Sequence, residues 1–353
     1  MVYYIPIEPL EERYTAQWYR WFPEALENRG VSFEVIDGKA LTDKIITGAF
    51  LDINSTVHYK AEQLKKISKL FFDGKVQDGD VFFVADIEFW GIESIRYLAD
   101  LNNIKVRLCG FCHAASHTTE DFISKCASYA KFIERGWFEV FDVVFVGSQY
   151  HKNKILEYHA ELADKIMVSG NPYKSVEITD GIKGVQKKNR VILTNRPDYE
   201  KRPNLTLDVF QILKDKYPAW EFMVTTGRDE WGSGWLRSLA KSLEKKGVIT
   251  IKEGLTKAEY LNFLAESKIM TGNTIEENFG YCILEAMICN TIPIVSNGYS
   301  HPELLEGHHN LLFNSIIEQV ELIEQCIDTG IDIDFSKRVS YYDSVLSVIV
   351  DCL

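Results

Sequence analysis

The sequence from Thr274 to Met287 reads TIEENFGYCILEAM. The apolar pair Ile269–Met270 precedes it, and the apolar run Ile292–Val295 follows it. Apolar runs on either side of a segment with helical period predict a strand, a polar loop, a helix that begins near Gly280, and a second strand. In a parallel α/β sheet, such a loop lies at the carboxyl end of its strand, where ligands bind. The stretch therefore predicts an α/β fold and a binding site within it.

Two carboxylates, Glu277 and Glu285, lie eight residues apart in this stretch. Glu277 falls in the predicted loop and Glu285 about two turns into the predicted helix, so we expect both to face one crevice. One carboxylate can bind sugar hydroxyls and the other a ribose. The predicted helix N-terminus at Asn278, Phe279 and Gly280 offers backbone N–H groups and the positive end of a dipole to a diphosphate.

Strand-like runs alternate with helical segments along the whole chain. They are Val2–Ile5, Ser32–Ile36, Val81–Ala85, Lys105–Cys109, Val143–Val146 and a short run at Lys165–Val168, then Val191–Thr194, Glu221–Thr225, Val248–Ile251, Ile269–Met270 and Ile292–Val295. A Gly-Asn-Pro breaker at 170–172 separates the two sets. We expect two doubly wound parallel domains, 1–170 and 171–338. A final helix over 339–353 follows, for which packing against the first domain is one option.

The composition fits an ordinary globular protein. The chain has 353 residues, 46% apolar and 25% charged, a formal net charge of −12, and seven cysteines without regular spacing. An acidic chain is not expected to bind nucleic acid mainly through counterion release. With no signal-like N-terminus and no run of about 18 apolar residues, we expect a cytoplasmic protein with reduced thiols and no membrane span.

The segments Glu277–Gly280 and Glu285–Met287 resemble the signature of the retaining GT-B glycosyltransferases of family 4, a Glu, seven residues and a second Glu. The resemblance extends over about 190–305 and implies two Rossmann-like domains facing a central cleft. It implies sugar transfer from a nucleoside-diphosphate sugar to an acceptor hydroxyl, with retention. It also implies that Glu277 contacts the donor sugar and Glu285 the nucleotide ribose.

The loop after Val191–Thr194 carries Arg196 and Lys201, five residues apart, with Arg202 as a neighbour. Family members have a similar Arg and Lys at this spacing. The resemblance implies that these cations stabilise the charge of the leaving nucleoside diphosphate. A solvated loop of mixed charge is the alternative.

In the first domain, His113 and Asp86 follow predicted strands, Lys105–Cys109 and Val81–Ala85. Several family members have a His in the corresponding loop that contacts the sugar, and the resemblance implies this role for His113. A structural histidine is the alternative. Asp86 is placed to orient the acceptor hydroxyl, or else to cap the following helix.

Other motifs do not carry a function. The family's glycine-rich loop after the first strand is replaced by PIEPLEER at 6–13, so no contacts are transferred there. The CGFCH pattern at 109–113 matches a haem attachment motif, but it lies on a predicted buried strand, and a zinc site lacks a second ligand pair. Asp78-Gly79-Asp80 precedes its strand and predicts a turn. We expect no metal and no cofactor besides the donor substrate.

The acceptor is the least defined part. The lysines of 58–69 could contact phosphates, with Trp18, Trp21, Trp90 and Trp137 for stacking; a solvated helix and buried aromatics are the alternative. The overall composition resembles phage-encoded transferases that modify hydroxymethylated pyrimidines in DNA, which implies a flipped base as acceptor. Open alternatives are a glycan or small-molecule acceptor, a GT-B sugar-nucleotide epimerase, and a non-catalytic binder.

Overall fold

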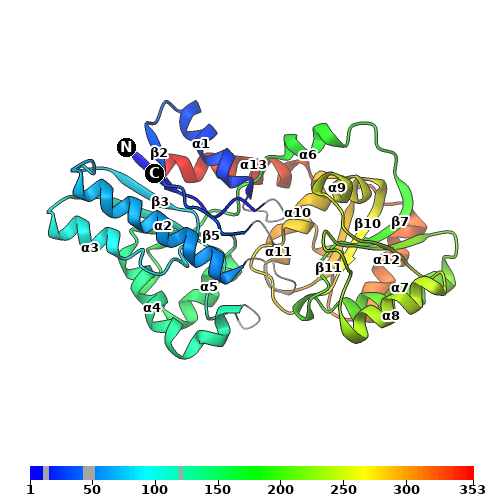
Figure 1. Ribbon diagram of the computed structural model, residues 1–353. Coiled ribbons are helices and arrows are strands. Elements are labelled where there is room, and N and C mark those ends of the chain that lie inside the picture. The colour runs from blue at the N-terminus through cyan, green and yellow to red at the C-terminus, as the bar shows by residue number, and fades with distance from the viewer. Residues whose placement is uncertain (11–15, 43–51, 119–121) are drawn as a thin grey trace. The chain divides into compact units, whose positions relative to one another are not determined.

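The computed structural model describes residues 1–10, 16–42, 52–118 and 122–353. The chain divides into two compact units (Figure 1). The first unit consists of Met1–Pro172 with Ser344–Leu353, and the second of Tyr173–Asp343. Each unit is built around one six-stranded sheet. Every strand pairing is parallel, which is the arrangement that β-α alternation predicts.

The sheet of the first unit has the order β2-β1-β3-β4-β5-β6. Its strands are β1 Val2–Ile5, β2 Phe33–Val35, β3 Val81–Val84, β4 Arg107–Cys112, β5 Val143–Val146 and β6 Ile166–Val168. Its helices are α1 Trp18–Asn28, α2 Ile53–Phe72, α3 Ser94–Leu101, α4 Ala127–Val140 and α5 Gln149–Tyr158. The central strands are continuous apolar runs because both faces of the sheet are buried.

The sheet of the second unit has the order β12-β11-β10-β7-β8-β9. Its strands are β7 Lys188–Leu193, β8 Glu221–Thr225, β9 Thr250–Lys252, β10 Ser267–Gly272, β11 Ile292–Ser296 and β12 Leu312–Phe313. Its helices are α6 Ser175–Gly181, α7 Pro203–Lys216, α8 Gly234–Lys245, α9 Lys257–Glu266, α10 Tyr281–Ile288, α11 His301–Leu304 and α12 Ile316–Thr329.

The strand order of the second unit reverses between β7 and β10, which pair directly at the centre of the sheet. The chain proceeds from β7 to β9 on one side and from β10 to β12 on the other. Such a reversal leaves room for a ligand beyond the carboxyl ends of the two central strands. The loops that follow β7 and β10 are therefore the ones best placed to form a site.

The last helix, α13 Ser336–Asp351, begins in the second unit and ends in the first. Near its end, Arg29 Nε donates to Asp351 at 2.6 Å, within the first unit. Near its start, the guanidinium of Arg338 donates to the Tyr342 hydroxyl at 3.1 Å, within the second unit. A helix at the end of the chain is confirmed, and it starts three residues before 339.

The predicted strands are all present, and their bounds differ most at β4. This strand runs to Cys112 and includes Gly110. A Cβ at Gly110 would lie 2.4 Å from Ile87 and 2.5 Å from Phe141, so the strand can continue there only with glycine. The strand β12 was not predicted from the sequence, since two residues are too few to show a period. In the loop after β1, Glu8 is buried and accepts a hydrogen bond from Thr56, while Glu11, Glu12 and Arg13 lie outside the described residues.

Candidate functional site

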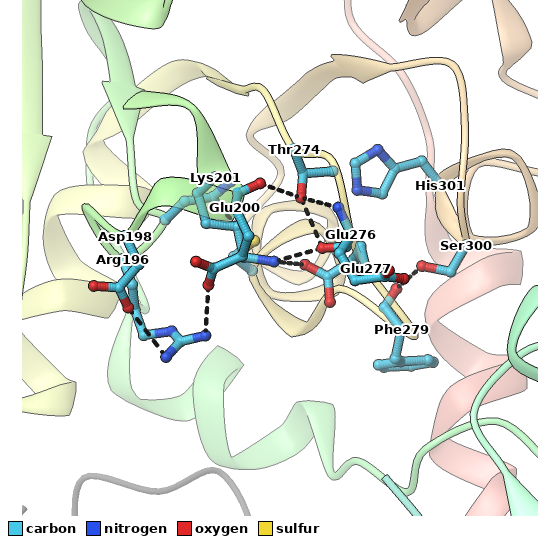
Figure 2. Close-up of polar contacts among 12 residues, drawn as sticks. Arg196, Asp198, Glu200, Lys201, Thr274, Glu276, Glu277, Phe279, Ser300 and His301 are labelled. Carbon is cyan, nitrogen blue, oxygen red and sulfur yellow. Dashed lines mark hydrogen bonds and ion pairs between the residues drawn. The ribbon is translucent and has the colours of Figure 1, made fainter. Parts of the chain in front are cut away.

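The loops after β7 and β10 meet at the carboxyl edge of the second sheet (Figure 2). The backbone N–H of Ile275 donates to the carbonyl of Glu200 at 2.8 Å, and the hydroxyl of Thr274 donates to the same carbonyl at 3.1 Å. These bonds join two segments far apart in sequence. They bring the predicted cations of the first loop next to the predicted carboxylate of the second.

Lys201 and Glu277 form a direct pair. Lys201 Nζ donates to Glu277 Oε2 at 2.8 Å and to the carbonyl of Glu276 at 3.0 Å, and the lysine is 9% exposed. Burial raises the pKa of Glu277, but Lys201, His301 and Arg196 outweigh this effect and hold the pKa below its usual value. Glu277 is therefore ionised at neutral pH.

Arg196 belongs to a chain of alternating charges. Its guanidinium contacts Asp198 at 3.2 Å and Glu200 at 3.0 Å. Arg228, in the loop after β8, donates to both oxygens of Asp198 at 2.7 and 3.0 Å. Although burial raises the pKa of Asp198, hydrogen bonding by Arg228 and the nearby cations lower it overall. The loop is thus a structured charge network rather than solvated residues of mixed charge.

The helix α10 begins directly after the pair. Gly280 precedes its first residue with φ of +96°, and a Cβ there would lie 3.0 Å from Leu304. The hydroxyl of Ser300 donates to the carbonyl of Phe279 at 2.7 Å, which fixes the turn from the other side. Glycine is therefore required for both conformation and space, and the N-terminal N–H groups of α10 lie beside Glu277.

His301 was not predicted from the sequence. It is 4% exposed, its Nδ1 donates to the carbonyl of Ser296 at 2.9 Å, and burial lowers its pKa against the opposing charge of Glu277. The only signal for it in the sequence is its position shortly after β11, at the same edge of the sheet as the other residues.

Glu285 is the fifth residue of α10, just over one turn into the helix and not two, because the helix starts at Tyr281. It is 4% exposed and accepts three hydrogen bonds. The donors are the hydroxyl of Tyr173 at 3.0 Å, the hydroxyl of Tyr260 at 2.7 Å, and Nζ of Lys257. None of these partners was predicted; Lys257 and Tyr260 lie three residues apart on α9.

Cys282 connects the surroundings of the two carboxylates. Its thiol donates to the side chain of Asn195 at 2.9 Å. Burial first, and then the charges of Glu277 and Glu285, raise its pKa to about 12. Both carboxylates therefore act on one thiol, whereas their orientation toward a common crevice stays a prediction.

In the first unit, His113 and Asp86 lie at the carboxyl ends of β4 and β3. His113 Nε2 donates to the carbonyl of Ala85 at 2.8 Å. Asp86 pairs with Lys60 at 3.1 Å and accepts from the backbone N–H of Glu88 at 3.1 Å. Burial raises the pKa of Asp86, but Lys60 and then His113 outweigh it and lower it overall. The helix-cap alternative for Asp86 is wrong, since Glu93 precedes α3.

The basic helix and its tryptophans do not form a stacking platform. Trp18, Trp21 and Trp137 are buried, at 1%, 1% and 2% exposure. Lys60 is buried in its pair with Asp86. The exposed Lys69 pairs with Asp73 at 2.9 Å. Trp90, the fourth tryptophan, is 37% exposed, so the alternative of a solvated helix with buried aromatics holds for three of the four tryptophans.

Among the described residues, no group of three or more His, Cys, Asp or Glu side chains is arranged to hold a metal ion. No helix in the described part of the chain is long and apolar enough to cross a membrane. Asp78-Gly79-Asp80 forms a turn, with the N–H of Asp80 donating to Gln77 at 3.1 Å.

Residues 175–342 match the family described as glycosyl transferases group 1. No curated protein matches the chain in sequence. Among solved structures, sucrose-phosphate synthase from Thermosynechococcus elongatus is 13% identical with a TM-score of 0.67, covering 100% of this chain and 94% of that one. An α,α-trehalose-phosphate synthase (UDP-forming) from Burkholderia vietnamiensis is 10% identical with a TM-score of 0.60, covering 99% and 96%.

A third structure, described as trehalose-6-phosphate from E. coli bound with UDP-2-fluoro glucose, is 11% identical with a TM-score of 0.62, covering 99% of this chain and 95% of that one. At these identities the likeness concerns the fold, which is GT-B. The family match covers Glu277, Glu285, Arg196 and Lys201, the residues around which the second unit builds its charged edge. The second unit carries a group 1 glycosyltransferase domain, and the chain is a glycosyltransferase of the GT-B type.

Proposed function

We propose that the chain transfers a sugar, with retention, from a nucleoside-diphosphate sugar to an acceptor hydroxyl, as the retaining enzymes of family 4 do. The observation that carries this proposal is the buried Lys201–Glu277 pair, 2.8 Å long, at the point where the strand order reverses and α10 begins. A cation, a carboxylate and a helix N-terminus lie together there, as a sugar joined to a diphosphate requires.

Each group has a distinct task in the transfer. The bond from the anomeric carbon to the diphosphate breaks, and the nucleoside diphosphate leaves with the electron pair. The acceptor oxygen bonds to the same carbon, and its proton passes to the departing diphosphate oxygen. Two cations, Lys201 and Arg196, stabilise the charge on the leaving diphosphate. The backbone N–H groups at the helix N-terminus, at Asn278, Phe279 and Gly280, do the same. Glu277 holds hydroxyls of the donor sugar.

The remaining candidates position the two ends of the reaction. Glu285, deep in α10, accepts from the ribose hydroxyls of the nucleotide. In the first unit, His113 contacts the sugar and Asp86 orients the acceptor hydroxyl, with the Lys60 pair holding Asp86 ionised. These roles follow from the resemblance, together with the positions of the three side chains after or within elements at the carboxyl edges of the sheets.

We propose a carbohydrate or another small molecule as the acceptor in preference to a hydroxymethylated pyrimidine of phage DNA. The comparisons give no support to a DNA acceptor, and two of the structural neighbours are named as sugar-phosphate synthases. The buried Trp18, Trp21 and Trp137 supply no stacking platform for a flipped base. One neighbour is described as UDP-forming, which makes UDP-sugars the first donors to test.

The test is a screen of UDP-, ADP- and GDP-sugars by thermal shift, followed by mass spectrometry with sugar phosphates, oligosaccharides and hydroxymethylated duplex DNA as acceptors. A transferase yields free nucleoside diphosphate and a glycosylated acceptor. An altered sugar nucleotide would indicate an epimerase, and an unchanged donor a binding protein. Transfer to DNA alone would overturn the proposed acceptor class.

A further inference from the structure

The carboxylate of Glu285 accepts hydrogen bonds from three side chains. Its Oε1 accepts from the hydroxyl of Tyr173 at 3.0 Å and from Lys257 Nζ, and its Oε2 accepts from the hydroxyl of Tyr260 at 2.7 Å. An ionised carboxylate has about four lone-pair positions. Tyr173 and Lys257 therefore fill both positions of Oε1, and Tyr260 fills one of the two positions of Oε2, which sets the direction of the position that remains.

The three donors differ in how firmly they are held. Tyr173 is 2% exposed, and its ring packs against Tyr281, the first residue of α10, at 5.8 Å between centroids. Tyr260 lies on α9 and Lys257 one turn earlier, with a side chain that is 44% exposed. The tyrosines hold the carboxylate from the packed side, and the lysine approaches it from the exposed side.

The tyrosine hydroxyls remain protonated. Burial, followed by the charge of Glu285, raises the pKa of Tyr173 and that of Tyr260 well above the ordinary value. Both hydroxyls are thus protonated and donate to Glu285 at neutral pH. Without such donors, the carboxylate would rotate about a broad terminal torsion.

We propose that Tyr173 and Tyr260 are positioning residues for ribose recognition: they fix the Glu285 carboxylate so that its Oε2, on which Tyr260 leaves one position open, can accept a hydroxyl of the nucleotide ribose. This inference rests on the proposed donor site and adds residues that no motif contains. Tyr173 lies 112 residues from Glu285 in sequence and is the first residue of the second unit.

The test compares binding of UDP, ADP and GDP with binding of their 2′,3′-dideoxy counterparts by calorimetry. Tyr173→Phe and Tyr260→Phe should each raise the Kd of the ribonucleotide about tenfold, while the Kd of the dideoxy form stays within about twofold of wild type. Glu285→Gln should remove the discrimination between the two forms. The matched control is Tyr217→Phe, because the Tyr217 hydroxyl also donates to a carboxylate, that of Asp328 at 3.0 Å, on the exposed surface of the same unit.

The experiment distinguishes failure of this inference from failure of the proposed donor site. If wild type and Tyr217→Phe prefer the ribonucleotide and both site variants keep this preference, the tyrosines do not position Glu285 and the inference is wrong. Equal weakening of both nucleotides in the site variants would show a general structural role and would also reject it. Failure of the wild-type protein to bind any of these nucleotides would reject the proposed donor site itself.

Discussion

Each unit buries a lysine–carboxylate pair at the carboxyl edge of its sheet, and the two pairs have different neighbours. Lys201 and Glu277 lie 2.8 Å apart beside the charge chain that begins at Arg196. Lys60 and Asp86 lie 3.1 Å apart, and Lys60 also donates to the carbonyl of Glu88 and stands over the ring of Phe89. The Lys201–Glu277 pair lies among further charged side chains, which suits an anionic ligand. The Lys60–Asp86 pair instead joins the loop after β3 to helix α2.

The largest expected effect comes from breaking the first pair. Lys201→Met removes the cation that meets the leaving diphosphate, and we expect kcat/KM to fall about 10²- to 10³-fold. The measurement is the rate of nucleoside-diphosphate release with the donor found in the screen. Lys214→Met is the matched control, since Lys214 in α7 of the same unit donates to the backbone carbonyls of Pro218 and Trp220. Equal rates in both variants would contradict the role of Lys201.

Breaking the second pair should act on stability. Lys60→Met leaves the largely buried Asp86 without its cation, and we expect the free energy of unfolding to fall by about 3 kcal/mol. Urea denaturation followed by circular dichroism measures it. The double variant Lys60→Met/Asp86→Asn should recover part of the loss, because no uncompensated charge remains. A double variant less stable than Lys60→Met would show that the pair does not behave as a coupled unit.

A smaller effect is expected at the turn before α10. Gly280→Ala combines a φ of +96° with a Cβ 3.0 Å from Leu304, and we expect a loss of about 2 kcal/mol in the free energy of unfolding. Gly307→Ala is the control, since Gly307 has a φ of +86° with no atom within 4 Å of the added Cβ. The difference between the variants, measured in urea, isolates the close contact. Equal losses would assign the whole effect to backbone strain.

The smallest effect concerns acid stability in the first unit. Burial, with Lys154 and His159, lowers the pKa of His117 to about 3. Its stabilisation is complete above its ordinary pKa of about 6.5 and is lost as the pH falls from there toward 3, because only the unfolded chain binds the proton. From pH 7 to 5.5 we expect a loss of about 1 kcal/mol in the free energy of unfolding.

Hydrogen exchange of peptides from the first unit measures this loss. His117→Phe should reduce its pH dependence, whereas His309→Asn, which replaces an exposed histidine in the second unit, should leave it unchanged. A pH dependence in His117→Phe as steep as in wild type would contradict the prediction.

Most of the fold could be predicted from the sequence because parallel strands are buried on both faces and form continuous apolar runs. There are two local exceptions. Gly110 interrupts the apolar run of β4, so the sequence did not show where this strand ends, and β12 is too short to show a pattern. The helix start near Gly280 was predicted correctly, but Glu285 lies just over one turn from that start and not the two turns expected.

Whether a contact in the site could be predicted depends on how far apart its residues lie in the sequence. Glu277, Gly280 and Glu285 share one strand-loop-helix segment, so their spacing carries information. The contacts of Lys60 and Tyr173 come from elsewhere in the chain, 26 and 112 residues from their carboxylates, and only the folded sheets bring them together. Arg228 and His301 follow other strands of the same sheet and join the site through its common edge.

The most direct test of the donor site is a crystal structure with the nucleoside diphosphate that the screen identifies. The account predicts the diphosphate within hydrogen-bond distance of Lys201 and Arg196 at the N-terminus of α10, and the ribose hydroxyls on Glu285. A nucleotide bound elsewhere, with the Lys201–Glu277 pair undisturbed and no phosphate beside it, would contradict it.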